Sequence, residues 1–197
     1  MQQPSMQSPK RRRIAVIGDG EVPADHPYYH LAQALGRLLA DRNHIVVTGG
    51  LAGIMEAAPR GAHDSAHYTP GSTLGILPTS QPQHANQWID IPIPTSLSHA
   101  RNTIVAQSDA VIAIGGGAGT LSEICFAWIN RRLIIALDTR AHSNHIGWSN
   151  LLLDHPLDHR TRFPDIPNDR IYAATTPDHA AQLLDQHLPR YLAHPSN

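Results

Sequence analysis

Short apolar runs alternate along this chain with longer segments in which apolar residues recur at helical spacing. Runs that are apolar throughout are typical of strands buried on both faces. They predict strands at residues 14–17, 45–47, 73–77, 110–114 and 133–137. Two further extended segments are residues 88–93, where Pro92 suits an edge strand or an irregular segment, and residues 171–174.

The helical spacing predicts helices near residues 28–39, 54–66, 97–108, 121–130, 148–153 and 177–188. Pro27 suits the first turn of the first helix, and Thr176 suits the N-cap of the last one. Pro59 removes one backbone donor inside the second helix, so we expect a kink or a late helix start there. Strands that alternate with helices predict an α/β protein whose parallel sheet carries helices on both faces.

Length and charge limit the possible classes of function. The 197 residues suffice for one α/β domain, which we place at residues 13–189 between flexible tails at 1–12 and 190–197. A net charge of -1 creates no field that would attract nucleic acid. No apolar stretch approaches the roughly 20 residues that cross a bilayer, so no membrane role is expected. Residues 1–10 lack the apolar core of a secretory signal.

Two local features have an ordinary interpretation. The single cysteine, Cys125, cannot form an internal disulfide, which fits a cytoplasmic setting, and we expect it to be a small core residue. The basic cluster from Lys10 to Arg13 could contact RNA or an acidic partner. A solvated end that keeps the first strand soluble is the favoured interpretation.

Glycine-rich turns follow three of the predicted strands. Residues 115–124 read GGGAGTLSEI between a buried strand and a helix start. Glycines let the backbone approach an anion, and the N–H groups and dipole of the helix favour one, so this segment predicts a phosphate site. The carboxyl ends of parallel strands share one edge of the sheet, and ligands bind there where the strand order reverses. The glycines are Gly18 and Gly20, then Gly49, Gly50 and Gly53, then Gly115, Gly116, Gly117 and Gly119.

Common nucleotide and metal motifs are missing. No Gly-Lys-Ser/Thr follows a glycine turn, and the first strand lacks the full GxGxxG spacing. Of the 14 histidines, His63 and His67 lie one helical turn apart, but no HExxH or Cys/His framework accompanies them. We therefore expect neither a Walker site, nor a standard dinucleotide site, nor a structural metal.

Arg101 is the most informative charged residue. In the predicted helix 97–108 it falls within the apolar arc, where a guanidinium must find an anion or carbonyl groups. A ligand phosphate is the favoured partner, and an internal ion pair or a snorkelling side chain is the alternative. His99 falls on the other side of this helix, so we do not expect it to assist Arg101.

Glu123 allows two interpretations. Residues 120–123 read TLSE, a capping box with Thr120 as N-cap, and periodicity places Glu123 opposite the apolar face of its helix. The same position lies beside any phosphate sugar bound at the glycines. There Glu123 could bind a sugar hydroxyl or stabilise positive charge at an anomeric carbon.

Four motifs in order resemble a known superfamily over about residues 13–137. They are TGGLAGIMEAAPRGA (48–62), GILP (75–78), DIPIPTSLSHARN (90–102) and IGGGAGTLSE (114–123). This superfamily of Rossmann-like proteins includes the Lonely-guy phosphoribohydrolases, often labelled lysine decarboxylase-like, and the molybdenum cofactor carrier proteins. The resemblance implies a Rossmann-like, doubly wound parallel sheet.

The hydrolases carry a PGGxGTxxE motif and an arginine on a helix. Here Glu123 matches the final glutamate of the motif, and Arg101 matches the helix arginine. The chain departs from them at Gly115, Asn102 and Ser122, where they have Pro, usually Lys and commonly Glu. The glycine at Gly115 and the segment DIPIPTSLSHARN make it more similar to the carriers. Together, the glycine turns and the resemblance predict a set of ligand-binding residues, namely Gly18, Asp19, Gly20, Gly49, Gly50, Gly53, Arg101, Gly115, Gly116, Gly117, Gly119, Thr120 and Glu123.

The resemblance favours a carrier or storage protein for the molybdenum cofactor (molybdopterin). The alternative is an enzyme that hydrolyses nucleoside 5′-monophosphates to free base and ribose 5-phosphate, with Arg101 and Glu123 as catalytic residues. A nucleotide-sensing module is a third possibility. Both groups imply a homodimer or homotetramer, and the carrier reading adds molybdoenzymes or cofactor-synthesis proteins as partners.

Overall fold

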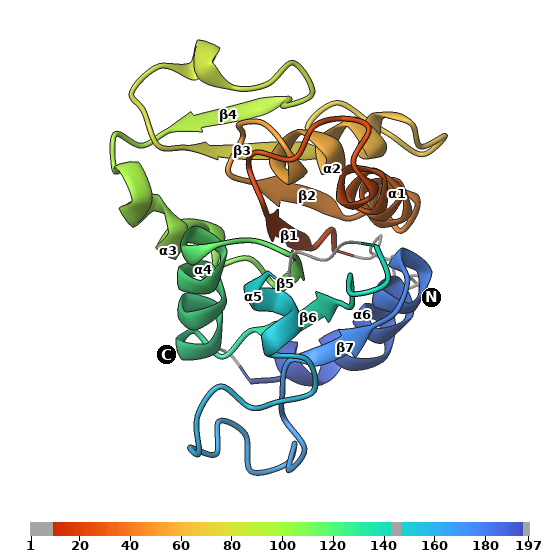
Figure 1. The fold of residues 1–197 in the computed structure, drawn as a ribbon, viewed down its shortest axis with the longest axis vertical. Helices are drawn as coiled ribbons and strands as arrows, with labels where there is room; N and C mark the ends of the chain where they lie inside the picture. Colours follow the sequence, from red (N-terminus) through yellow and green to blue (C-terminus); the bar gives the residue numbers. More distant parts are fainter. Residues whose placement is uncertain (1–9, 143–146, 195–197) are drawn as a thin grey trace, which may run out of the picture.

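The computed structural model describes residues 10–142 and 147–194. Its centre is a parallel seven-stranded sheet with the order β4-β3-β2-β1-β5-β6-β7 (Figure 1). The strands are β1 (Arg13–Gly18), β2 (Ile45–Thr48), β3 (Thr73–Leu77), β4 (Ile91–Pro94), β5 (Ala110–Ile114), β6 (Leu133–Leu137) and β7 (Tyr172–Ala174). The predicted strands are confirmed, including the proline-containing β4 at the edge of the sheet.

Helices cover both faces of the sheet, as expected for a doubly wound Rossmann-like fold (Figure 1). The α-helices are α1 (Pro27–Asp41), α2 (Ile54–His63), α3 (Asn102–Val105), α4 (Ala118–Ile129), α5 (Trp148–Leu151) and α6 (Pro177–Leu192). Two 3₁₀ turns are η1 (Pro82–His84) and η2 (Ser98–Arg101). Among the described residues, no helix combines the length and apolar character needed to span a membrane.

Alternation along the strands divides the interior into two cores. Ile14 and Val16 of β1 pack with α1, α2 and α6 on one face. Ala15 and Ile17 pack with α3 and α4 on the other. Successive side chains of a strand point to opposite faces, so every central strand must be apolar throughout. This requirement explains why the strands were readable as uninterrupted apolar runs.

The strand order reverses between β1 and β5. The chain passes from β1 outward through β2 and β3 to β4, then returns to β5 and continues outward through β6 to β7. Gly18 at the end of β1 pairs with Ile114 at the end of β5. The turns that follow these two strands therefore begin side by side, where open α/β sheets form their ligand crevice.

Helix α2 begins where the helical spacing predicts and ends earlier than predicted. It begins at Ile54, so the expected late start is wrong, and it ends at His63. Pro59 lies inside it and has no N–H for the carbonyl of Met55, four residues earlier. That carbonyl instead accepts hydrogen bonds from Thr48 Oγ1 at 3.1 Å and Asn86 Nδ2 at 3.2 Å. Side chains outside the helix thus replace the bond that proline removes.

Both expected tails are shorter than predicted. Arg12 accepts a backbone hydrogen bond from Ile45 at 2.7 Å, and the Arg11 guanidinium donates to Ser72 at 2.6 Å. Helix α6 continues to Leu192 because Tyr191 is buried and donates to Asp169 at 2.5 Å. Residues 11–12 and 190–192 therefore belong to the domain. Residues 1–9 and 195–197 of the expected tails lie outside the described residues.

Candidate functional site

A cavity of about 660 Å³ lies at the carboxyl edge of the sheet, where the turns after β1, β2 and β5 meet η2. This is the crevice that the reversal of strand order predicts. The candidate residues that line it are Gly18, Asp19, Gly20, Gly49, Arg101, Gly117, Gly119, Thr120 and Glu123. These residues come from separate parts of the sequence, and the fold brings them together.

Four predicted glycines do not line the cavity, namely Gly50, Gly53, Gly115 and Gly116. Each has a positive φ, between 62° and 89°, which disfavours other residues. A Cβ on Gly53 would lie 2.5 Å from the Asp19 carbonyl oxygen, and one on Gly116 would lie 2.2 Å from Thr120 Oγ1. The backbone of the turns therefore requires these glycines, and they do not border the cavity.

Arg101 is 7% exposed and lines the cavity, and its guanidinium has few partners among the described residues. Buried Nε and Nη1 make no hydrogen bond within the described structure. Nη1 lies 3.9 Å from Glu123 Oε1, and Nη2 lies 3.9 Å from Met55 Sδ. Burial lowers the pKa of Arg101, and the Glu123 charge opposes that shift. A buried guanidinium with unused donors is suited to an anionic ligand.

The local backbone explains how Arg101 enters the cavity. The expected helix 97–108 is wrong: the segment forms the 3₁₀ turn η2 followed by the short α3. Leu97 and Ile104, predicted to be core residues with Arg101, are exposed. His99 lines the same cavity as Arg101, although the predicted helix placed it on the other side. Gly49 makes room, since a Cβ there would lie 2.6 Å from the Arg101 guanidinium nitrogens.

Glu123 is a buried cavity residue, and the predicted capping box is wrong. Helix α4 begins at Ala118 with Gly117 as its N-cap, so Thr120 is already inside the helix. Glu123 is 8% exposed, although periodicity placed it opposite the apolar face. Burial raises the pKa of Glu123 to about 7, and the Arg101 charge opposes the rise. Near neutral pH the side chain can therefore hold or release a proton.

The start of α4 supplies the second feature suited to an anion. A Cβ on Gly117 or Gly119 would meet nothing within 4 Å, so packing does not require glycine at either position. Both residues line the cavity. The first amides of a helix have no partner within it, and the helix dipole makes this end positive. The missing side chains leave the approach to these amides open.

Several cavity residues were missed by the sequence reasoning, among them Glu21, Met55 and Asn102. Asn102 Nδ2 donates to Ser122 Oγ at 2.8 Å and to the Gly119 carbonyl at 3.3 Å. The signal for Asn102 was present, because it follows Arg101 directly in a quoted motif. Met55 and Glu21 had no such signal, since they depend on how the turns pack.

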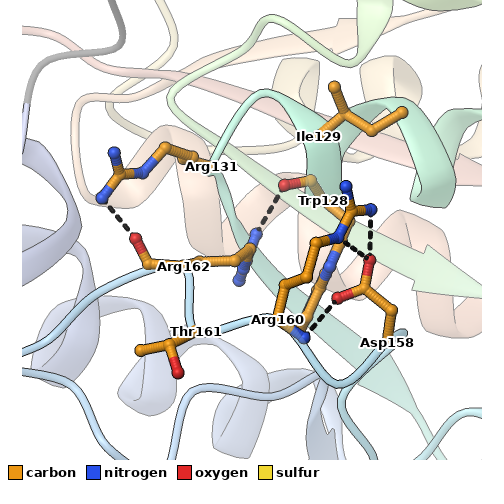
Figure 2. A pocket seen from close by; sticks show the side chains of 7 residues that line it. All are labelled: Trp128, Ile129, Arg131, Asp158, Arg160, Thr161 and Arg162. Carbon is orange, nitrogen blue, oxygen red and sulfur yellow. Dashed lines mark hydrogen bonds and ion pairs between the residues drawn. The ribbon is translucent and has the colours of Figure 1, made fainter.

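A smaller cavity of about 250 Å³ lies beside the end of α4 and has a different character. Figure 2 shows its arginines bonded to other parts of the protein: Arg160 to Asp158, and Arg162 to the Trp128 carbonyl. Arg131 donates to the Arg162 carbonyl, although its Nε has no partner within the described structure. Within the described residues, no group of three or more His, Cys, Asp or Glu side chains could hold a metal ion. The cavity with Arg101 therefore remains the main candidate.

The known proteins to which this chain is similar include molybdenum cofactor proteins and phosphoribohydrolases. The molybdenum cofactor binding protein from Rippkaea orientalis is 32% identical, with a TM-score of 0.70 over 91% of this chain and 98% of that one. The molybdenum cofactor carrier protein from Chlamydomonas reinhardtii is 25% identical, with a TM-score of 0.67 over 93% and 100%. A cytokinin riboside 5′-monophosphate phosphoribohydrolase from Mycobacterium tuberculosis is 30% identical over 72% of this chain and 83% of its own length.

These similarities confirm the superfamily that the four sequence motifs indicated. They do not separate carrier from hydrolase, because both groups are represented. The model of one family, the SLOG cluster4 family, matches residues 11–156, which include every strand from β1 to β6 and all the cavity residues. The chain belongs to the SLOG cluster4 family.

Proposed function

We propose that this protein binds a phosphorylated small molecule in the 660 Å³ cavity and acts as a carrier or storage protein for the molybdenum cofactor. The first amides of α4 would hold the phosphate, and Arg101 would pair with it. The turns at Gly18–Gly20 and Gly49 would border the rest of the ligand.

The observation that carries this proposal is the state of Arg101. Its guanidinium is buried, two of its nitrogens make no hydrogen bond among the described residues, and it reaches one carboxylate oxygen only at 3.9 Å. Burying a charge costs several kcal/mol unless it is well paired. A ligand phosphate would supply the missing acceptors, so the residues present fit a phosphorylated ligand.

The pair formed by Asn102 and Ser122 favours the carrier over the hydrolase. The phosphoribohydrolases that the sequence resembles usually have Lys and Glu at these two positions. Here the side chains form a neutral hydrogen bond of 2.8 Å beside the cavity. The two departures thus compensate each other, and the site lacks one cation and one carboxylate that the hydrolases have. The similarity to two molybdenum cofactor proteins gives further support.

Hydrolysis of a nucleoside 5′-monophosphate is the second candidate because of Glu123. A pKa of about 7 suits a group that takes up or gives a proton near neutral pH, and in its ionised form Glu123 would stabilise positive charge at an anomeric carbon. The relative from Mycobacterium tuberculosis is named for this reaction. In that case Arg101 would orient the phosphate while Glu123 acts at the sugar.

We further infer a cytoplasmic homodimer or homotetramer that exchanges its ligand with molybdoenzymes or cofactor-synthesis proteins. The support is the similarity in fold to a carrier protein, together with the single half-buried Cys125. Size-exclusion chromatography with light scattering measures the oligomeric state.

One pair of measurements separates the two candidates. Native protein is purified and its bound small molecules and molybdenum are identified by mass spectrometry. The same protein is incubated with AMP and modified adenosine monophosphates, and released base is measured by chromatography. The carrier predicts bound molybdopterin and no release. Base release that disappears in Glu123→Ala would support the hydrolase and contradict the carrier.

A further inference from the structure

The polar lining of the main cavity divides into two regions of opposite charge. Arg101 and the start of α4 form the positive region. Asp19 and Glu21, on the turn between β1 and α1, form a separate acidic region of the same cavity. The pairing of Gly18 with Ile114 starts both turns at the same level on adjacent strands. One ligand can therefore contact both regions.

The backbone around Asp19 is held in place. The Asp19 carbonyl accepts a hydrogen bond from Ile54 at 3.0 Å, and Asp19 Oδ1 accepts one from the Glu21 amide at 2.9 Å. Gly53 lets the next turn approach, because a Cβ there would collide with the Asp19 carbonyl. Within the described structure, Asp19 Oδ2 has no hydrogen bond or ion pair. The carboxylate thus presents a positioned acceptor that the protein does not use.

The acidic region is not part of a cluster of protein metal ligands among the described residues. No group of three or more potential metal ligands occurs among the described residues, those of the cavity included. The buried Arg101 in the same cavity, whose Nε and Nη1 make no hydrogen bond among the described residues, independently indicates a ligand with an anionic end. The opposite end of that ligand must then be compatible with a carboxylate. An ionised carboxylate only accepts hydrogen bonds, so the ligand must donate them.

We propose that Asp19 selects phosphorylated ligands whose heterocycle presents two adjacent N–H donors. The 2-amino-4-oxopyrimidine edge, shared by pterins and guanine, has this pattern and can donate two charge-assisted hydrogen bonds to one carboxylate. The corresponding edge of adenine places a ring acceptor beside its amino donor, so it presents a lone pair to the carboxylate. This inference rests on the proposed function and names the ligand class for that site.

Isothermal titration with GMP, IMP and AMP tests the proposal, because the three share a ribose phosphate and differ at this edge. GMP offers two donors, IMP offers one, and AMP offers a donor beside an acceptor. We expect affinity to fall in the order GMP, IMP, AMP. Chromatography after each titration verifies that the nucleotides remain intact. Wild-type protein that binds AMP as tightly as GMP would overturn the selection by Asp19.

The variant Asp19→Asn tests the residue directly. Its side-chain oxygen can still accept from the Glu21 amide, while an NH₂ group replaces the free acceptor. We expect GMP affinity to fall about 10- to 100-fold, as for loss of a charged hydrogen bond, with AMP affinity unchanged or higher. The matched control is Asp25→Asn, an exposed carboxylate outside the cavity, which should leave both affinities unchanged. An equal loss for all three nucleotides in Asp19→Asn would contradict a role in selection.

Inorganic phosphate separates the two levels of inference. If neither phosphate nor any nucleotide binds the wild-type protein, the proposed function fails and the selection by Asp19 fails with it. If phosphate binds in an Arg101-dependent manner but the three nucleotides bind equally, the phosphate site stands and only the role of Asp19 is wrong.

Discussion

Arg101 and Glu123 face each other across 3.9 Å inside the cavity, and each side chain is about nine-tenths buried. This separation exceeds that of a hydrogen-bonded ion pair, so the pair gains little that offsets the loss of water around two charges. Burial lowers the pKa of Arg101 and raises that of Glu123, which means that each shift favours the neutral form. The pair therefore lowers the stability of the ligand-free protein, and it makes the binding of a charged ligand more favourable.

Removing the positive charge should stabilise the free protein. We expect Arg101→Met to raise the free energy of unfolding at pH 6 by about 1 to 3 kcal/mol, because a similar-sized apolar side chain replaces a poorly paired cation. At that pH Glu123 is protonated in the variant, since its pKa of about 7 already includes the lowering effect of Arg101. Urea denaturation followed by circular dichroism measures the change.

The control for this prediction is Arg160→Met, which removes an exposed arginine paired with Asp158 and should change stability little. A clear loss of stability in Arg101→Met would show that the free protein uses the guanidinium structurally, although two of its nitrogens make no hydrogen bond among the described residues.

Glu123 predicts a specific dependence of stability on pH. The unfolded chain releases this proton near pH 4.5, whereas the folded chain holds it to about pH 7. Between these values the folded state binds more protons, so the Glu123 contribution falls as pH rises from 4.5 to 7 and then levels off. Glu123→Gln should match wild type near pH 4.5 and exceed it above pH 7 by at most about 3 kcal/mol. Urea denaturation from pH 4.5 to 8 tests this, and parallel curves would contradict the raised pKa.

At the scale of elements, α4 begins with glycines that the fold itself does not require. Gly117 has φ −97° and ψ −151°, a conformation open to other residues, and a Cβ there meets no atom within 4 Å. We expect Gly117→Val to reduce phosphate affinity at least about tenfold by blocking the amides of α4. Stability should fall by at most about 1 kcal/mol, because valine is a poorer N-cap than glycine. Phosphate titration of the folded variant measures this affinity. An unchanged affinity would show that the amides at the start of α4 do not bind phosphate.

In the contact between α1 and α2, by contrast, packing requires glycine. A Cβ on Gly36 would lie 1.9 Å from the Ala58 carbonyl oxygen, and one on Gly61 would lie 1.8 Å from the Gln33 carbonyl oxygen. The two helices therefore pack with their backbones in close approach. We expect Gly36→Ala to lower the free energy of unfolding by about 1 to 3 kcal/mol while the folded fraction still binds phosphate. A variant as stable as wild type would mean that the helices can separate at little cost.

At the scale of the whole molecule, the sequence predicted those features that depend on repeated apolar patterns and on local chemistry. Strands β5 and β6 matched their expected bounds because a strand buried on both faces must be apolar throughout. The location of the cavity also followed, since glycine turns after parallel strands collect at one edge. Arg101 was singled out as a cation among apolar residues and it is buried, although the helix assumed for it divides into a 3₁₀ turn and a short α-helix.

Features set by packing between distant segments could not be predicted. Glu123 matched a capping box in sequence, but α4 begins two residues before Thr120, so the carboxylate is carried into the cavity. Gly50 and Gly116 looked like ligand contacts, and only the folded backbone shows that they face Leu77 and the Thr120 side chain instead. A glycine required by a turn and one required by a ligand look the same in a sequence.

Stability of the entire fold should respond to an anion bound at this single site. A ligand at 100 times its Kd stabilises a protein by about 2.7 kcal/mol, and a protein of this size gains roughly 2 to 4 °C in Tm per kcal/mol. Saturating inorganic phosphate at constant ionic strength should therefore raise the Tm by about 5 to 10 °C, measured by scanning calorimetry. Arg101→Met should lose most of this gain, while Arg160→Met should keep it, because Arg160 already pairs with Asp158 outside the main cavity. An equal rise in all three proteins would mean that phosphate acts on the surface in general, and the cavity would then have no special affinity for anions.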